Sequence, residues 1–198
     1  MTLYHFIERE APAGAPLFLT FHGTGGDEHQ FFELAQMLLP HAHVLSLRGD
    51  VSEHGALRFF KRTGEGVYDM ADLAIRTQRM MEFVAAHRER TKASRVIGLG
   101  YSNGANILAS VLFQKPDLFD DAVLMHPLIP WTPADQAGLK GKRLLITAGK
   151  RDPICPALQS EKLGQYFEHQ GAISKLLWHD GGHELRQAEI DAARGFLN

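Results

Sequence analysis

Short apolar runs that alternate with longer amphipathic stretches constrain the fold of this chain more than any other feature of its sequence. The runs are mostly aliphatic and short, which is typical of strands buried on both faces of a sheet. Strands of this kind that alternate with helices form right-handed crossover units around a parallel sheet. The sequence therefore predicts an α/β fold with a mostly parallel central sheet flanked by helices.

The boundaries of the expected elements follow from this alternation. Strands are expected at residues 17–21, 44–47, 96–99, 122–125, 144–146 and 176–178, with an edge strand at 4–7. Helices are expected at residues 29–39, 69–87, 105–114, 157–170 and 184–197. Pro and Gly cluster at strand ends rather than in one linker, and 198 residues suffice for a single core, so we expect one domain over residues 1–198.

Segment 48–67, RGDVSEHGALRFFKRTGEGV, is the one long stretch without a clear strand or helix pattern. A loop of this length inside a compact domain is more often functional than idle. In an open parallel sheet, ligands bind beyond the carboxyl ends of the strands, so segments that follow strands are the first candidates for a site. We therefore expect this segment to form one wall of a substrate pocket.

Charge, cysteine content and hydropathy exclude several classes of protein. The net charge is −2 at pH 7, and no run of Lys or Arg is long enough to follow a phosphate backbone, so we expect no nucleic-acid partner. The single cysteine, Cys155, excludes an internal disulfide, which suits a reducing compartment. No apolar run approaches the roughly 20 residues that span a bilayer, and acids occupy the N-terminal region where a signal peptide is basic. These observations predict a cytoplasmic protein with no membrane span.

The stretch Gly100-Tyr101-Ser102-Asn103-Gly104 joins a predicted strand to a predicted helix. It matches Gly-x-Ser-x-Gly in the strand-turn-helix setting in which this pattern presents a nucleophilic serine. The glycines remove side chains that would collide with neighbouring backbone, and Ser102 would lie at the positive end of the next helix. Such short patterns also occur as ordinary turns. The interpretation therefore depends on whether the chain supplies the other parts of a catalytic site.

A serine hydroxyl is a weak nucleophile, so it needs a general base, and the base needs an acid that orients it. Asp152 lies just past the predicted strand 144–146, and His183 lies on a glycine-containing loop past strand 176–178. The chain order of Ser102, Asp152 and His183 is the order that accompanies this turn on this kind of sheet. The three residues are therefore expected to form a catalytic triad.

Other residues fit the roles of base and acid less well. His179 is the nearest competitor of His183, but it lies at the strand end, before the two glycines that give His183 its reach. Asp180 is too close to His183 along the chain to lie behind its ring. Three further aspartates precede a strand and so fall at the wrong edge of the sheet, namely Asp117, Asp120 and Asp121.

Acyl transfer also requires N–H donors for the oxyanion. The backbone N–H of Asn103, directly after the serine, is the first candidate. The second is expected from the glycine-rich segment 21–28, FHGTGGDE, in which Thr24 N–H is the preferred donor. This segment lacks the patterns of phosphate-binding and dinucleotide-binding loops, so no nucleotide cofactor is expected. His22 is interpreted as structural, with its ring hydrogen-bonded to loop backbone.

The spacing of histidines does not favour metal catalysis. His183-Glu184 lacks the second histidine of the His-Glu-x-x-His zinc motif, and His41 and His43 are interpreted as structural. We therefore expect neither a catalytic metal nor any other cofactor. Cys155 is interpreted as a packing residue, because no nucleophile turn surrounds it.

Together, these motifs resemble the α/β-hydrolase superfamily, and within it the small carboxylesterase/phospholipase family, which includes acyl-protein thioesterase relatives and bacterial hydroquinone-resistance-type esterases. The resemblance covers nearly the whole chain, in the segments FHGTGGDEHQFFELA, LRFFKRTGEGVYDMADL, GLGYSNGANI, AGKRDPICP and GGHELRQAEI. It implies an uncapped hydrolase of esters or thioesters, with Ser102, Asp152 and His183 as the triad and Thr24 and Asn103 as oxyanion donors. Thioesterases more usually carry glutamine in place of Asn103, which weakens that identity.

The expected activity is cleavage of small to medium carboxylic esters through an acyl-enzyme. Alternatives are an acyl thioesterase or lysophospholipase-like activity, and a non-catalytic small-molecule sensor on a hydrolase scaffold. An exposed apolar edge would support a homodimer, as in some relatives. Aromatic and other side chains of the middle segment and of the stretch after strand 122–125 either line the substrate pocket or fill the core. These candidates are Arg58, Phe59, Phe60, His126, Leu128 and Trp131.

Overall fold

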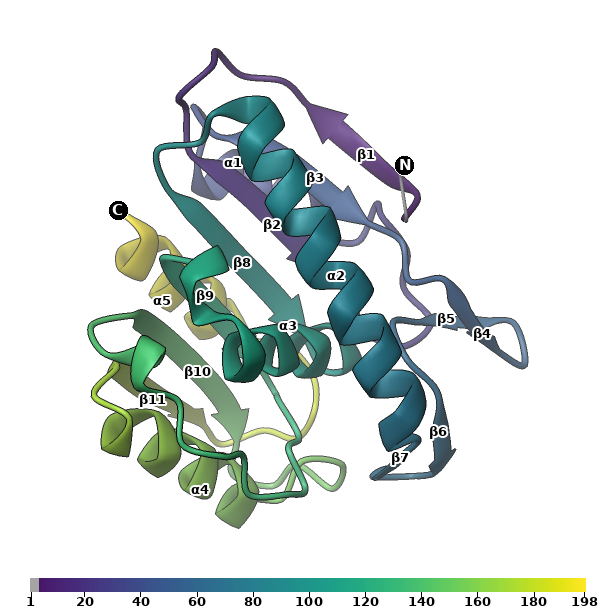
Figure 1. Cartoon of the computed structure of the whole chain (residues 1–198). Helices are drawn as coiled ribbons and strands as arrows, with labels where there is room; N and C mark the ends of the chain where they lie inside the picture. The colour runs from purple at the N-terminus through teal and green to yellow at the C-terminus, as the bar shows by residue number, and fades with distance from the viewer. Residues whose placement is uncertain (1–3) are drawn as a thin grey trace.

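A seven-stranded sheet forms the centre of the computed structural model, which describes residues 4–198 (Figure 1). The strand order is β1-β3-β2-β8-β9-β10-β11, and every neighbouring pair is parallel except β1 and β3. The strands are β1 (Phe6–Arg9), β2 (Leu17–Phe21), β3 (His43–Leu47), β8 (Val96–Tyr101), β9 (Asp121–Met125), β10 (Arg143–Gly149) and β11 (Ile173–His179). The prediction of a mostly parallel α/β sheet is confirmed.

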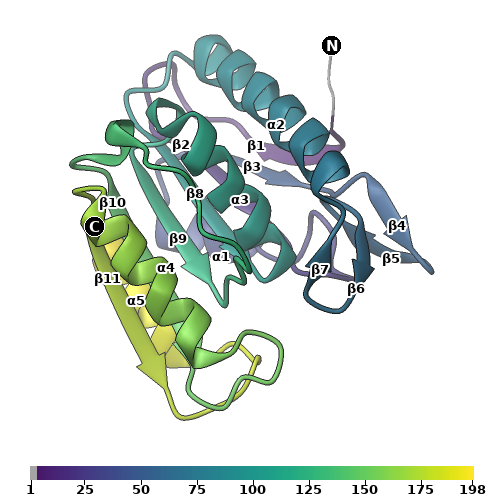
Figure 2. The ribbon, with the colours of Figure 1, turned by 60° about the horizontal axis from the view of Figure 1, so that its bottom comes forward.

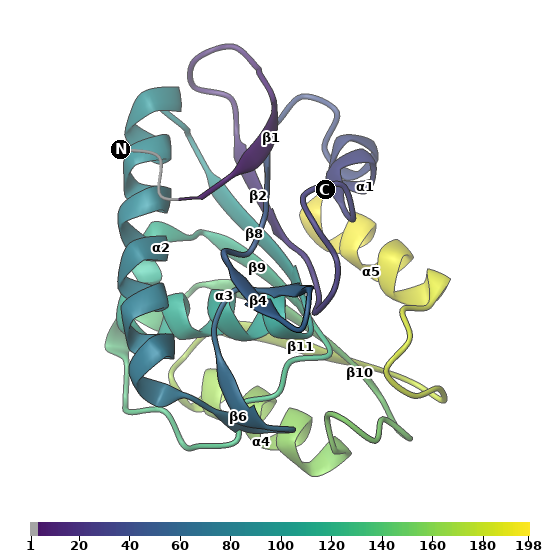
Figure 3. The same cartoon turned by 90° about the vertical axis from the view of Figure 1, so that its right-hand side faces the viewer.

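Helices cover both faces of the sheet, as the edge-on view in Figure 3 shows. One face carries α2 (Met70–Thr91), α3 (Asn103–Gln114) and α4 (Ala157–His169), and the other carries α1 (Phe32–Leu38) and α5 (Gln187–Leu197). Two short 3₁₀ turns precede strands, at Pro116–Leu118 and Ala137–Leu139. Among residues 4–198, no helix combines the length and apolarity that crossing a bilayer requires.

The residue pattern of β2 explains why the sheet must be covered on both faces. Leu17, Leu19 and Phe21 pack into the core beneath α2 and α3, whereas Phe18 packs into the core beneath α1 and α5. Successive strand side chains point to opposite faces, so a strand that is buried at every position requires a helical layer on each side. All five residues of β2 are buried.

Segment 48–67 differs from the expectation of one long irregular loop. It contains β4 (Val51–Glu53) paired with β5 (Ala56–Arg58), and β6 (Arg62–Gly64) paired with β7 (Val67–Tyr68). The first hairpin turns at His54-Gly55, where both residues have positive φ, 51° and 90°. This is the conformation that two-residue hairpin turns favour. The two hairpins lie beside the start of α2 (Figure 2).

The carboxyl ends of the parallel strands bring distant segments of sequence together. Ser102 follows β8, His126 follows β9, and Asp152 lies in the loop after β10. The loop after β11 carries His183 back toward them, and a Cβ on Gly149 would lie 2.0 Å from the carbonyl oxygen of Gly182. This close approach of the two backbones is possible only because residue 149 has no side chain.

Candidate active site

Ser102 occupies a strained turn between β8 and α3. Its backbone has φ 52° and ψ −116°, a conformation that costs a non-glycine residue on the order of 1–3 kcal/mol. The Ser102 N–H donates to the carbonyl of Met125 at 2.9 Å. A Cβ on Gly104 would lie 2.3 Å from the carbonyl oxygen of Phe21, and a Cβ on Gly100 would lie 2.6 Å from the carbonyl carbon of Gly104. The two glycines of the motif therefore permit the tight packing that holds the turn.

The structure brings the three predicted triad side chains into hydrogen-bond contact. His183 Nε2 lies 2.9 Å from Ser102 Oγ, and His183 Nδ1 lies 2.7 Å from Asp152 Oδ2. The hydroxyl of Tyr101 donates to the carbonyl of His183 at 2.7 Å and so fixes the loop that carries the ring. The Asp152 side chain is fully buried, whereas the His183 side chain is 17% exposed. The histidine therefore links a partly exposed serine to a fully buried aspartate.

Four donors surround the carboxylate of Asp152. Its Oδ1 accepts the backbone N–H groups of Ile154 and Cys155 at 2.8 and 2.9 Å. Its Oδ2 lies 2.8 Å from Nδ1 of His126 in addition to the contact with His183. Burial alone would raise the pKa of Asp152, but the Cys155 N–H and the two histidines hold that pKa below its ordinary value. Asp152 is therefore ionised at neutral pH and held in one orientation.

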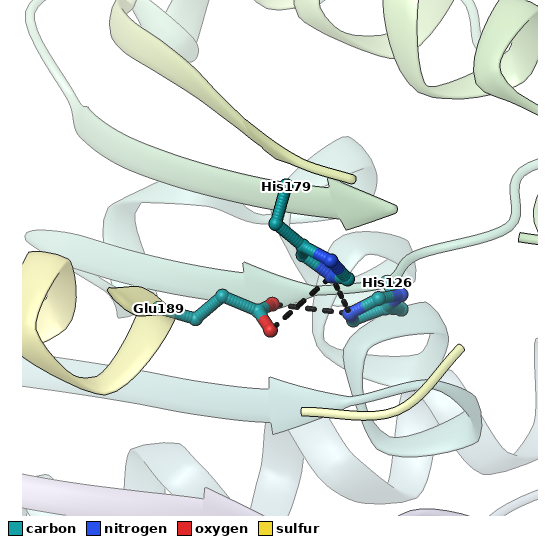
Figure 4. A group of neighbouring side chains, drawn as sticks. All are labelled: His126, His179 and Glu189. Carbon is teal, nitrogen blue, oxygen red and sulfur yellow. Dashed lines mark hydrogen bonds and ion pairs between the residues drawn. The ribbon is translucent and has the colours of Figure 1, made fainter. Parts of the chain in front are cut away.

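His126 lies behind Asp152 and does not line an open pocket, which corrects the expectation from sequence. The residue has no exposed surface and a positive φ of 51°. Its Nε2 lies 3.0 Å from Oε1 of Glu189, whose side chain is also fully buried. Figure 4 shows these two side chains with His179, whose Nε2 lies 3.4 Å from Glu189 Oε2. Donor atoms of these three side chains lie within 4.8 Å of one another, as do those of His126, Asp152 and His183.

Sequence reasoning did not single out Glu189, which lies inside α5. Its Oε1 accepts the hydroxyl of Thr147 at 2.5 Å, and its Oε2 accepts the N–H of Arg186 at 2.7 Å. Glu189 lies in the first turn of α5, three residues after the N-cap residue Arg186, where an acidic side chain often accepts the N-cap N–H. That local signal marks the start of the helix and says nothing about the contact with His126.

The glycine-rich loop after β2 packs against the serine turn. A Cβ on Gly23 would lie 2.6 Å from the ring of Tyr101. Within residues 4–198, neither the N–H of Thr24 nor that of Asn103 has a hydrogen-bond acceptor. Both groups are therefore available to a ligand. His22 binds loop backbone through both ring nitrogens, to the carbonyl of Gly23 and the N–H of Gly49, as expected for a structural residue.

Asparagines in the first turn of α3 tie the hairpin segment to the serine turn. Asn103 Oδ1 accepts the N–H of Phe59 at 2.7 Å. Asn106 donates to the hydroxyl of Tyr68 at 2.8 Å and accepts the N–H of Leu128 at 2.7 Å. The helix that begins at the serine thus also holds the two segments that were expected to form the pocket.

The other predicted pocket residues are either buried in the protein interior or, in the case of Trp131, line a cavity away from the triad. Phe59 and Phe60 have no exposed surface, so their rings fill the core rather than line a pocket. The Arg58 side chain is nearly buried and donates to Thr24 Oγ1 at 2.8 Å, and Leu128 is also buried. Trp131 lines a cavity of about 570 Å³ along α4 that none of the triad residues borders. These residues differ from the expectation because most of them pack against the protein interior. The sequence cannot distinguish such packing from packing against a ligand.

Glu28 anchors the glycine-rich loop to the end of β3. Its buried carboxylate accepts Nε and Nη2 of Arg48 at 2.5 and 2.6 Å. Burial would raise the pKa of Glu28, but the Arg48 guanidinium holds it at about 2, against an ordinary value of 4.5. Because the folded-state pKa is depressed, the carboxylate stabilises the fold above pH 4.5, and this contribution is lost as the pH falls toward 2.

We expect Glu28→Gln to lower the urea midpoint of unfolding at pH 7, with a difference from wild type that narrows as the pH falls below 4. Equilibrium urea unfolding at pH 7, 5 and 3 measures it. The matched control is Glu33→Gln, which removes an exposed acid of α1. An equal midpoint at pH 7, or a difference that does not change with pH, would show that the ion pair does not stabilise this loop.

Comparison with known proteins agrees with this architecture. The model of the dienelactone hydrolase family matches residues 60–189. The putative hydrolase MhqD of Bacillus subtilis is 44% identical over 180 residues, which cover 90% of this chain and 90% of the relative. The structure of Atu2452 from Agrobacterium tumefaciens, a protein of unknown function, is 56% identical with a TM-score of 0.93, covering 98% of this chain and 95% of that one.

A carboxylesterase of Bacillus cereus is 37% identical, with a TM-score of 0.91 over 98% of this chain and 93% of that chain. The fold, the order of the motifs and the likeness to these proteins confirm the resemblance expected from the sequence. The family match spans more than half of the chain. The chain therefore belongs to the dienelactone hydrolase family and is a hydrolase with the α/β-hydrolase fold.

Proposed function

We propose that this protein is a serine hydrolase that cleaves carboxylic esters of small to medium size through an acyl-enzyme. The observation that carries the proposal is the unbroken series of contacts from Ser102 Oγ through the ring of His183 to Asp152 Oδ2, at 2.9 and 2.7 Å. This arrangement provides a nucleophile, a base and an orienting acid in one hydrogen-bonded set. The 37% identity to a carboxylesterase supports an ester as the substrate.

In the proposed reaction, His183 Nε2 takes the proton of Ser102 Oγ while the oxygen attacks the ester carbonyl carbon. The N–H groups of Thr24 and Asn103 donate to the oxyanion that forms. His183 then gives its proton to the leaving alcohol, and the ester C–O bond breaks to leave an acyl-serine. Water then attacks the acyl carbonyl carbon as it gives a proton to the same nitrogen. The bond from the acyl carbon to Ser102 Oγ breaks to release the carboxylic acid, and His183 returns the proton to Ser102 Oγ. Asp152 Oδ2 accepts the hydrogen bond of His183 Nδ1–H throughout and so keeps Nε2 available as the base.

A fluorophosphonate probe tests the nucleophile without requiring knowledge of the substrate. We expect one equivalent of probe per chain, on the peptide that contains Ser102, located by mass spectrometry after digestion. The Ser160→Ala variant serves as the control, because Ser160 Oγ is buried in α4 without a hydrogen-bond partner among the described residues. It should label as fully as wild type. Labelling at a different residue, or none in folded protein, would contradict the assignment of Ser102 as the nucleophile.

A further inference from the structure

One imidazole lies between two buried carboxylates behind the proposed triad. The side chains of His126, Asp152 and Glu189 are all fully buried. His126 Nδ1 lies 2.8 Å from Asp152 Oδ2, and its Nε2 lies 3.0 Å from Glu189 Oε1. Two carboxylates buried this close together are costly unless a positive charge compensates them.

The hydrogen bonds of the neighbouring histidine indicate which ring carries that charge. His179 Nδ1 accepts the backbone N–H of Gly181 at 3.0 Å, so the single proton of a neutral His179 lies on Nε2, on the side of Glu189. His126 has a carboxylate oxygen at each ring nitrogen. A neutral His126 would direct the lone pair of Nε2 or Nδ1 at one of these oxygens, and at Nε2 it could accept, among residues 4–198, only from His179 Nε2, at 3.3 Å. A ring with two N–H groups instead donates to both carboxylates, at 2.8 and 3.0 Å. The geometry therefore assigns the positive charge to His126.

A metal ion is the competing explanation of the cluster. His126 Nε2 lies 3.3 Å from His179 Nε2, and contacts of 3.0 and 3.4 Å join these atoms to Glu189. Such spacings resemble those around a tetrahedral ion with bonds of about 2.0–2.1 Å. A histidine can coordinate a metal only through an unprotonated nitrogen. Because the bond from Gly181 places the His179 proton on Nε2, that nitrogen has no lone pair for a metal. The hydrogen bonds thus favour a proton over a metal.

We propose that His126 is a positioning residue, a buried imidazolium that links Glu189 to Asp152, holds the Asp152 carboxylate toward His183, and opposes protonation of His183 by its own charge. The part that concerns His183 rests on the proposed function, whereas the protonation of His126 does not. The positive φ of 51° at His126 is consistent with a residue held in place for its side chain. Its backbone N–H donates to the carbonyl of Thr147 at 2.8 Å.

Within residues 4–198, the carboxylates of Asp152 and Glu189 are the acidic groups in contact with the His126 ring. Burial would lower the pKa of His126, but Glu189 and Asp152 raise it above the ordinary value. Burial raises the pKa of Tyr101 to about 12, and it also raises the pKa of Cys155, so both groups are neutral. The titratable groups that face His126 are Asp152 and Cys155 after β10, Glu189 on α5, His179 on β11, His183 after β11, and Tyr101 on β8.

The variant His126→Gln tests the effect on the base. The rings of His126 and His183 lie 5.2 Å apart, so removal of the positive charge favours protonation of His183. We expect the acid limb of the pH profile of kcat/KM to move up by about one pH unit, which corresponds to roughly tenfold lower activity on that limb. A residue that only supports the fold would lower the plateau and leave the limb where it is. An unmoved limb in folded His126→Gln would overturn the proposal.

The matched control is His179→Gln. This change removes a ring that contacts Glu189 and His126 but not Asp152. Both carboxylates beside His126 remain in this variant, so the acid limb should stay in place. The control also tests the metal alternative, by elemental analysis of purified protein. Stoichiometric zinc in wild type that is absent from His179→Gln would overturn the assignment of a proton to His126. Absence of stoichiometric metal in wild type supports it.

Nitrogen NMR of ¹⁵N-histidine-labelled protein tests the charge on His126 directly and does not depend on turnover. We expect both ring nitrogens of His126 to remain protonated from pH 6 to 8, with the resonances assigned from the two histidine variants. In Glu189→Gln, the pH at which His126 loses a ring proton should fall by at least about one unit. A singly protonated His126 in wild type at pH 7 would overturn the proposal, even where His126→Gln fails to fold. If Ser102 proves not to be the nucleophile, this measurement still decides the state of His126.

Discussion

Replacement of Ser102 by alanine is expected to lower kcat for p-nitrophenyl acetate by about 10⁴-fold or more. The expectation follows from the contact of Ser102 Oγ with His183 Nε2 at 2.9 Å, since alanine removes the attacking atom and leaves the base without its partner. The strained φ of 52° remains in the variant, so the turn loses a hydroxyl and keeps its backbone strain. Steady-state kinetics at a pH on the plateau of the wild-type profile measure the loss.

The control for this experiment is again Ser160→Ala, which deletes a serine hydroxyl outside the site. It should retain turnover within a factor of two or so, given the usual small effect of a change away from special features. Urea unfolding of both variants separates loss of chemistry from loss of fold. Undiminished turnover by folded Ser102→Ala would remove the basis for the proposed serine mechanism.

Asp152→Asn is expected to have the second largest effect, a decrease in kcat of about 10⁴-fold. An asparagine at this position is nearly isosteric, but it carries no charge to stabilise a protonated His183. The two atoms that contact Asp152 Oδ2 are ring nitrogens of His126 and His183, and both are N–H donors. The asparagine amide must present either an N–H, which repels these donors, or an oxygen, which carries no full charge. The neutral asparagine therefore orients His183 less firmly, and it leaves Glu189 as the one carboxylate among the described residues in contact with the charged His126 ring.

Asp180→Asn is the comparison for Asp152→Asn. Asp180 was the rival acid by sequence, and in the structure its exposed carboxylate pairs with Lys150 at 2.8 Å, away from the triad contacts. Its replacement should leave kcat close to that of wild type. Comparable losses in both variants would show that Asp152 has no special role, and a full loss only in Asp180→Asn would transfer the role of acid to that residue. The same kinetic assay and unfolding curves serve both variants.

Much of the fold follows from the sequence because the central strands are mostly apolar and are buried at nearly every position. A run such as Val96-Ile97 has no exposed face to maintain, which excludes a surface helix or a half-exposed strand. The positions of Ser102, Asp152 and His183 follow for a related reason, since each residue comes soon after a strand of one parallel sheet. Parallel strands bring all such loops to a single edge.

The parts that sequence did not predict depend on contacts between distant segments. Glu189 reaches Thr147 and His126 because α5 packs across the ends of β9 and β10, and no pattern within α5 specifies that packing. Phe59 and Phe60 have aromatic side chains of the kind that line pockets, yet the surrounding core covers them completely. The hairpin at His54-Gly55 is a different case, because Gly55 is itself a local signal for the positive φ that a two-residue turn requires.

The short amide side chain of Asn103 fixes the distance between the serine turn and the segment that contains Phe59. Its 2.7 Å bond to the Phe59 N–H sets how far the strand-paired segment stands from the serine turn. A glutamine here adds one methylene, so the same bond would require a displacement of the order of one carbon–carbon bond, about 1.5 Å. A change of a single residue within α3 can therefore reshape the surroundings of the serine while the Asn103 N–H, on the main chain, keeps its place.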